Sequence, residues 1–293
     1  MWTGNAQQRI QEAAATNASA LGLDGLGLTQ IPEELRDLTT LRELDLSRNN
    51  IRELPDWLPD LSGLEKFIIS NNELYSLQSL AKMSNLASLS VNSNPIAEFP
   101  AWIRTATNLK TLELGGPQFP GLSDWMGELT SLRRLHISEY GLTELPEWIR
   151  YLKGLTEIGF TMNRLRDLPQ WMVELDNLER VYGGSNEFLQ VPKPLLDLVR
   201  LRGLYLHKNR IAELPVAPGG LRNLHHLTLF ENPLQEIPGW IGELVQLKSL
   251  LLDGLNCKLP PELGDLTRLT TLRMENCGLG EVPSWVSRLT GLT

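Results

Sequence analysis

One phrase, LxxLxL, recurs along almost the whole chain at intervals of 22 or 23 residues. Its opening leucines stand at positions 41, 64, 86, 109, 132, 155, 178, 201, 224, 247, 269 and 292. So many near-identical intervals in succession cannot arise by chance, and a period in the twenties is typical of a solenoid in which each repeat forms one coil. A chain of 293 residues could otherwise hold two ordinary domains, so the period decides the class.

Each repeat predicts a short strand followed by a turn. In the stretch "LRELDLSRNN" the strand spans 43–47, and Leu44 and Leu46 point inward. Beyond the strand, backbone NH and CO groups are buried between coils, where an inward amide can supply both a donor and an acceptor. This explains the amide at one repeat position, occupied by Asn49, Asn72, Asn94, Asn163, Asn186, Asn209 and Asn232.

We call this column of asparagines along the repeats the asparagine ladder. Four repeats have another residue at the ladder position: Pro117, Tyr140, Leu255 and Cys277. The unit "LGGPQFPGLSDW" departs most from the pattern, so a distorted turn is expected there. The repeat that opens at 247 is one residue short, and an irregular loop is expected near 255–258.

The full pattern, LxxLxLxxNxLxxLPxxLxxL, resembles that of the leucine-rich repeat family. The resemblance implies an α/β fold: a right-handed solenoid curved like a horseshoe, with a parallel β-sheet on the concave face. Segments such as "LPEWIRYL" at 145–152 would form short helices or 3₁₀ turns on the convex face, where proline suits a helix start. The LPxxL form is similar to intracellular repeats of plant disease-resistance, Ras-scaffold and bacterial proteins, which implies protein recognition without chemistry.

The two ends of the chain differ from the repeats between them. Residues 1–17 predict an N-terminal helical cap, with a helix over 6–15 and Asn5 as its N-cap, and 18–40 read as a degenerate first repeat of a repeat domain spanning 18–293. At the other end Leu292 opens a further repeat, and no polar cap follows. We therefore expect a fragment of a longer protein, or association through the uncapped C-terminal end.

Composition excludes several classes of function. A net charge of -8 argues against a nucleic-acid binder, and no apolar run is long enough for a membrane span. Residues 1–150 carry a net charge of -7 and residues 151–293 only -1, which favours the second half for an acidic partner. Cys257 and Cys277 are the two cysteines, and with no secretory signal they indicate a cytoplasmic protein with a reduced, buried pair.

No catalytic, metal or cofactor signature is present in the sequence. Phosphate-loop, HExxH, GxSxG and CxxC motifs are absent, so we expect no enzyme activity and no cofactor. The four histidines fall in strand segments without a third metal ligand at a convincing spacing. Seven tryptophans recur at one position after the LP dipeptide, where packing between convex segments is favoured over an aromatic binding stripe; they are Trp57, Trp102, Trp125, Trp148, Trp171, Trp240 and Trp285.

The variable side chains of the strands change character along the chain. Small polar residues dominate the early repeats, whereas aromatic, apolar and basic residues gather later, a composition typical of interaction hot spots. Ordinary strand propensity and cross-strand packing are the alternative explanation. The predicted partner-binding residues, for a protein or peptide, are Arg134, His136, Arg180, Tyr182, Tyr205, His207, Lys208, His226, Phe230 and Leu251.

Two further functions remain open at this point. The chain could be the recognition part of a larger signalling enzyme, such as a Roco-type GTPase or an effector ubiquitin ligase, with the catalytic domain outside it. Carbohydrate binding through the aromatic residues is a weaker alternative.

Overall fold

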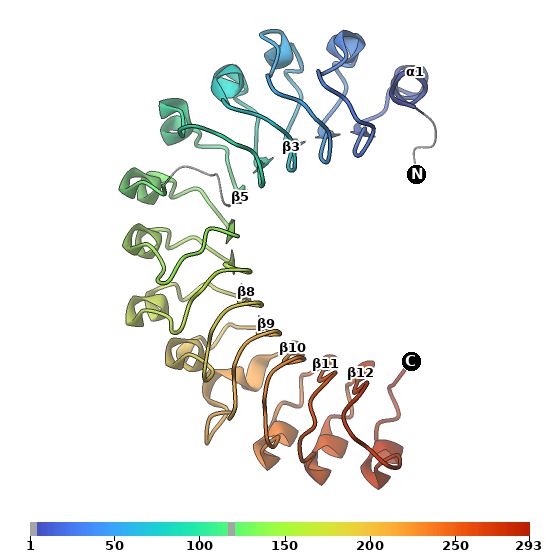
Figure 1. Cartoon of the computed structure of the whole chain (residues 1–293), viewed down its shortest axis with the longest axis vertical. Helices are drawn as coiled ribbons and strands as arrows, with labels where there is room; N and C mark the ends of the chain where they lie inside the picture. Colours follow the sequence, from blue (N-terminus) through green and yellow to red (C-terminus); the bar gives the residue numbers. More distant parts are fainter. Residues whose placement is uncertain (1–4, 117–120) are drawn as a thin grey trace. The chain divides into compact units, whose positions relative to one another are not determined.

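The structure is a computed structural model, and it describes residues 5–116 and 121–293. The chain divides into two compact units, the first ending at Tyr140 and the second spanning Gly141–Thr293. Each unit stacks coils so that the strands lie along one side and short helices along the other (Figure 1). Pro117, part of the unit for which a distorted turn was expected, lies outside the described residues.

In the first unit the strands pair in parallel and in chain order, and each contributes one central apolar residue to the core. The central residues Leu44, Phe67, Leu89, Leu112 and Leu135 are in register with their neighbours. All five are fully buried, which fixes the register because a one-residue slip would turn them to solvent. The strands are β1 (Ala20–Gly22), β2 (Glu43–Asp45), β3 (Lys66–Ile68), β4 (Ser88–Ser90), β5 (Thr111–Gly115) and β6 (Arg134–Ser138).

The second unit repeats this arrangement. Ile158, Val181, Leu204, Leu227 and Leu250 form its in-register apolar column, and Leu272 is the corresponding residue of the last strand. The strands are β7 (Glu157–Gly159), β8 (Arg180–Tyr182), β9 (Gly203–Tyr205), β10 (His226–Thr228), β11 (Ser249–Leu251) and β12 (Thr271–Arg273). This confirms the predicted solenoid with a parallel sheet.

The return segment of each coil is a 3₁₀ helix, as predicted, and most of them follow a proline such as Pro146 or Pro169. Proline has a fixed φ and lacks an NH that would otherwise need a partner at the helix start. The helices of the first unit are η1 (Glu33–Asp37), η2 (Leu58–Asp60), η3 (Gln78–Lys82), η4 (Ala101–Thr105) and η5 (Asp124–Glu128). Those of the second are η6 (Glu147–Tyr151), η7 (Gln170–Glu174), η8 (Lys193–Asp197), η9 (Gly219–Asn223), η10 (Gly239–Glu243), η11 (Pro261–Asp265) and η12 (Ser284–Arg288).

The predicted role of the ladder asparagines is confirmed by their hydrogen bonds. The amide of Asn209 donates to Gly183 O of the preceding coil at 3.0 Å and to Leu206 O of its own coil at 3.0 Å. Its carbonyl accepts from Phe188 N at 3.2 Å. All seven ladder asparagines are buried, and each amide forms hydrogen bonds that join its coil to the coil before it.

The residue just before the ladder position adopts a left-handed backbone conformation in coil after coil. Glycine occupies it in three coils, as Gly25, Gly116 and Gly254, and other residues occupy it elsewhere. The non-glycine residues are Arg48, Asn71, Ser93, Glu139, Met162, Ser185, Lys208, Glu231 and Asn276. This turn aims the ladder side chain into the core even though such φ values are unfavourable for these residues.

The coils without a ladder asparagine use other solutions. Cys277 is buried, and its thiol donates to Leu252 O at 3.1 Å, the bond to the preceding coil that an asparagine would form. Burial raises the pKa of this thiol, which keeps the donor proton in place. Leu255 is fully buried as an apolar residue and supplies no such bond.

The predicted N-terminal helix is present as α1 (Ala6–Thr16). The side chain of Asn5 accepts from Gln8 N at 3.0 Å, which confirms the N-cap, and Ile10 and Ala13 are buried. Among the described residues no helix has the length and apolarity needed to cross a membrane.

Candidate functional site

The outward side chains of the second unit's strands form an aromatic patch, which we define as Tyr182, Tyr205, His207 and Phe230. Tyr182 and Tyr205 occupy equivalent places on the paired strands β8 and β9. Their rings are stacked, with centroids 4.4 Å apart and an angle of 1° between the planes. Both tyrosines are half-buried, so their rings remain available to a partner.

The second half of the patch lies two residues further along the coils. The His207 ring stacks on Phe230 with centroids 4.6 Å apart and planes 11° apart. Nδ1 of His207 also lies 3.4 Å from Thr228 Oγ1. Burial, followed by the charge of Lys208, lowers the pKa of His207, so the imidazole is neutral near pH 7 and stacks as an uncharged ring.

Two glycines make room for these rings. A Cβ at Gly184 would lie 2.4 Å from His207 Cε1, and a Cβ at Gly203 would lie 3.0 Å from Tyr205 Cε2. Any side chain at Gly184 would therefore displace the histidine, and one at Gly203 would crowd the tyrosine. The pre-formed stacks thus depend on Gly203, at the start of β9, and on Gly184, two residues beyond β8.

The phenol of Tyr182 is held neutral by its surroundings. Burial, then the charge of Glu157, raises its pKa to about 12. Arg180 acts in the opposite direction, and its Nη1 lies 3.7 Å from Glu157 Oε2. At neutral pH the patch therefore offers hydroxyl and ring surfaces without a formal charge.

The predicted binding residues belong to both units. Lys208 follows His207 and pairs with Glu231 at 3.6 Å, and Leu251 is in register with Thr228 of β10. Arg134 and His136 lie on β6 of the first unit, where Arg134 Nε donates to Thr111 Oγ1 at 3.0 Å. The histidines do not all lie within strands: His207 follows β9 and His225 precedes β10.

Four of the repeated tryptophans have the structural role that their position predicts. Trp102 Nε1 donates to Leu77 O at 3.1 Å and Trp240 Nε1 donates to Pro215 O at 2.7 Å, in each case to the preceding coil. Trp148 and Trp285 are buried.

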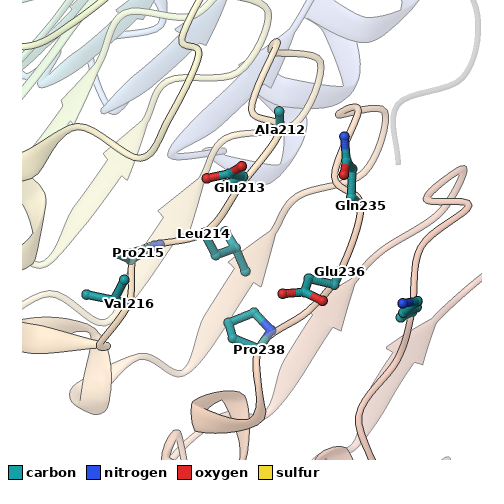
Figure 2. Close-up of a pocket in the computed structure, with 9 residues that line it drawn as sticks. Ala212, Glu213, Leu214, Pro215, Val216, Gln235, Glu236 and Pro238 are labelled. Atoms are coloured by element: carbon teal, nitrogen blue, oxygen red, sulfur yellow. The ribbon is translucent and has the colours of Figure 1, made fainter.

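Sequence reasoning missed one feature, a pair of cavities on either side of the segment 212–216. The repeat that opens at 201 has Ala217 where others have tryptophan, and η9 begins three residues later than its repeat position requires. Cavities of about 620 Å³ and about 820 Å³ result, and Leu214 and Pro238 border the smaller one (Figure 2). In the sequence, the motif "LPVAPGG" in place of LPxWI was the signal that could have indicated this irregular coil.

The described residues contain no cluster of three or more side chains suited to a metal ion. Both cysteines are free, but the expectation of a buried pair is wrong for Cys257, which is only half-buried. Burial raises the pKa of Cys257 to about 11, so its thiolate is scarce at neutral pH. Cys257 therefore has no feature of an activated nucleophile.

Comparisons with known proteins give the family. Residues 39–96 match the sequence profile described as leucine rich repeat. A leucine-rich repeat protein of Leptospira interrogans is 25% identical, with a TM-score of 0.68, over 99% of this chain and 86% of that one. No curated protein matches the chain by sequence. Together with the repeat pattern and the coils, these findings show that the chain is similar to leucine-rich repeat proteins in sequence and in fold.

Two further solved structures share the fold. An internalin of Listeria monocytogenes is 20% identical with a TM-score of 0.64, over 97% of this chain and 87% of that one. The plant peptide hormone receptor RGFR1, solved in complex with RGF2, is 28% identical with a TM-score of 0.61. The match covers 94% of this chain but only 46% of the receptor, so the chain spans less than half of that protein.

Proposed function

We propose that the chain is a non-catalytic recognition module that binds a protein or peptide on the sheet face of its second unit. The observation that carries the proposal is the aromatic patch, in which two ring stacks are formed before any partner arrives. Proteins of this family act as interaction modules, which supports the general class. We include a cytoplasmic setting in the proposal, supported by the reduced thiol of Cys277 that acts as a ladder donor.

Pre-formed stacks favour binding for an energetic reason. A free aromatic side chain loses rotamer freedom when a partner covers it, at a cost of about 0.5–1.5 kcal/mol for each side chain. Tyr182, Tyr205 and Phe230 have already lost that freedom through stacking. They can therefore contribute more of their contact energy to affinity, as the anchors of interfaces do.

The form of the patch suits an extended segment. The rings lie on coils that are neighbours in the sheet, spaced by about 4.8 Å. A peptide crossing the strands would meet one ring or apolar residue on each coil. A peptide was likewise the occupant in the complex of the plant hormone receptor, and this supports a peptide partner by analogy.

The test begins with selection of peptides on the folded chain from a displayed random library, followed by calorimetric titration of the enriched sequences. The binding variant combines Tyr182→Ala, Tyr205→Ala and Phe230→Ala, and we expect it to bind at least ~100-fold more weakly because each hot-spot ring contributes about 1–2 kcal/mol. The control combines Tyr75→Ala and Tyr151→Ala, which remove exposed tyrosines away from the patch.

Equal affinity of the binding variant and the wild type would overturn the proposal. Circular dichroism and urea unfolding would establish that both variants fold. Binding of glycans in an array, lost in the same variant, would favour carbohydrate recognition instead.

A further inference from the structure

A row of basic residues borders the aromatic patch, at the end where the strands begin. Arg202, His225 and Lys248 occupy one repeat position in three successive coils of the second unit. Backbone hydrogen bonds stack them directly: His225 N donates to Arg202 O at 2.7 Å, and Lys248 N donates to His225 O at 2.8 Å. Within the described residues neither Arg202 nor Lys248 forms an ion pair.

Two more basic residues lie one position further on, at the strands themselves. Arg180 and His226 are both in register with Gly203, which separates them across β9. The Tyr205 ring lies over Gly203, since a Cβ there would be 3.0 Å from Tyr205 Cε2. After burial, the charges of His225, Arg180 and Lys248 lower the pKa of His226, which reports a positive local field.

We define the cationic edge as Arg180, Arg202 and Lys248, with His225 and His226 among them. Beside it is a cavity of about 340 Å³, whose lining includes Arg200, Arg202 and His225. Asn223 and Gln246 add polar groups to the lining, and Glu179 is the one acidic residue in it. The chain as a whole has a net charge of -8, so this basic region is local.

Opposite charges pair across coils at the same two repeat positions elsewhere in the chain. Arg42 Nη1 pairs with Glu65 Oε1 of the next coil at 2.7 Å. Lys66 Nζ pairs with Glu43 Oε1, also at 2.7 Å, and Arg180 of the edge lies 3.7 Å from Glu157. Opposite charges on neighbouring strands stabilise a sheet, yet among the described residues Arg202 and Lys248 have no such pair.

We propose that the partner of the sheet face is an acidic peptide segment whose carboxylates lie on the cationic edge while its aromatic or apolar residues lie on the aromatic patch. This inference rests on the proposed function and specifies the partner's chemistry. Charge complementarity supports this partner: its carboxylates would form charge-assisted hydrogen bonds with Arg202 and Lys248, which have no ion-pair partner among the described residues.

The two surfaces are close enough for one segment to reach both. Arg180 and Tyr182 are two residues apart on β8 and point to the same face of the sheet, about 7 Å from each other. His226 has the same relation to Thr228, beside which His207 and Phe230 stack. An extended peptide that alternates acidic and aromatic residues fits this spacing.

The probe is a fluorescein-labelled synthetic peptide of about ten residues in which glutamates alternate with tyrosine and phenylalanine, and its partner probe has glutamine at every glutamate. Fluorescence anisotropy measures the affinity of each for the full chain. We expect the glutamate peptide to bind at least ~10-fold more tightly than the glutamine peptide, and to weaken steeply as salt is raised.

Two charge-reversed variants locate the effect. Arg202→Glu with Lys248→Glu should abolish the preference for the glutamate peptide. Arg164→Glu with Lys258→Glu changes the net charge equally at cations away from the edge, and should preserve the preference. Equal binding of both peptides by the wild type would overturn the inference, as would equal loss of preference in both variants.

The outcomes also separate this inference from the proposed function. If Tyr182→Ala with Tyr205→Ala weakens both peptides equally but glutamate gives no advantage, the recognition face stands and the acidic partner is wrong. If the tyrosine variant binds both peptides like the wild type, the proposed function itself is wrong. A single-stranded oligonucleotide could also be tested as a competitor of the labelled glutamate peptide. If it competes as strongly as unlabelled glutamate peptide does, the surface binds any polyanion and the inference of a peptide partner is wrong.

Discussion

The two units share one coil plan, yet their sheet faces are built on different chemistry. In the first unit the outward groups satisfy one another: Ser70 Oγ lies 2.8 Å from Ser90 Oγ, and Ser90 Oγ donates to Glu113 Oε2 at 2.8 Å. In the second unit the outward groups include stacked rings, and Arg202 and Lys248 beside them form no ion pair among the described residues. Polar groups that already bond one another would have to exchange those bonds for bonds to a partner, so the contrast supports the proposed recognition face in the second unit.

The largest expected effect concerns what the units have in common, the asparagine ladder. Asn72→Ala in the first unit and Asn209→Ala in the second each remove an amide that bonds backbone groups of two coils. Each should cost about 3 kcal/mol or more, because orphaned buried groups cost about 1–3 kcal/mol apiece. Urea unfolding, read separately for the two units by hydrogen exchange, measures the loss.

Asn50→Ala is the control for the ladder, since Asn50 is exposed and makes only a long bond of 3.4 Å to Glu73. A loss in one unit with none in the other would show that the ladder does not serve both alike.

A smaller and unequal effect is expected from one glycine position that the units share. A Cβ at Gly115 would lie 2.3 Å from the backbone oxygen of Ser138, whereas a Cβ at Gly184 would meet only the side chain of His207. Gly115→Ala should therefore destabilise by about 1–3 kcal/mol, the usual cost of overpacking, and Gly184→Ala by less because the ring can rotate away. Thermal unfolding of both variants tests this order.

The glycine pair also separates stability from recognition. Gly184→Ala should disrupt the His207–Phe230 stack and so weaken peptide binding while the fold persists. Unchanged peptide affinity in this variant would show that the stack makes no contribution to recognition.

Reversing a charge at the second residue of a repeat should cost about 0.5 kcal/mol in either unit, the usual size for exposed cross-strand pairs. Glu65→Arg would place two arginines side by side in the first unit and destabilise it. Arg202→Glu would place a second carboxylate beside Glu179, whose backbone oxygen accepts from Arg202 N at 2.8 Å, and destabilise the second unit. Chemical denaturation at low and high salt measures both, and a stabilising effect of either variant would contradict this account.

The smallest effect expected is a pH dependence of the second unit. Burial lowers the pKa of both His207 and His226, so the folded state favours the neutral rings. The stability associated with these rings is complete above about pH 6.5, the unfolded value, and is lost as the pH falls through the folded values. NMR titration should place both pKa values below 6.5, and His207→Gln should reduce the loss of stability on acidification. A pKa above 6.5 for His207 would contradict its burial in the stack.

Much of the fold was predictable because the same local sequence pattern recurs in each repeat. The ladder asparagines, the N-cap Asn5 and the proline-led 3₁₀ helices each follow from a local rule repeated in every coil. Even Cys277 followed the family pattern, and the structure explains it by a thiol that donates to the preceding coil.

The rest depended on groups from different coils, which no local rule reports. The columns of variable residues placed Tyr182 beside Tyr205, but the ring geometry depends on space left by Gly203 and Gly184. The late start of η9 and the cavities beside Leu214 arise from one missing tryptophan and an added proline. Likewise, the lack of an ion-pair partner for Arg202 and Lys248 among the described residues could be recognised only by comparing neighbouring coils.

The ladder also has a direction, with a mechanical consequence. Asn209 and Asn232 each bond the coil before their own, so tension on the end of the second unit would load these side chains one coil at a time. At Leu255 the series is broken, because a leucine side chain neither donates nor accepts a hydrogen bond. Under force the coils beyond that leucine should therefore detach together, leaving the coils that carry the aromatic patch still wound.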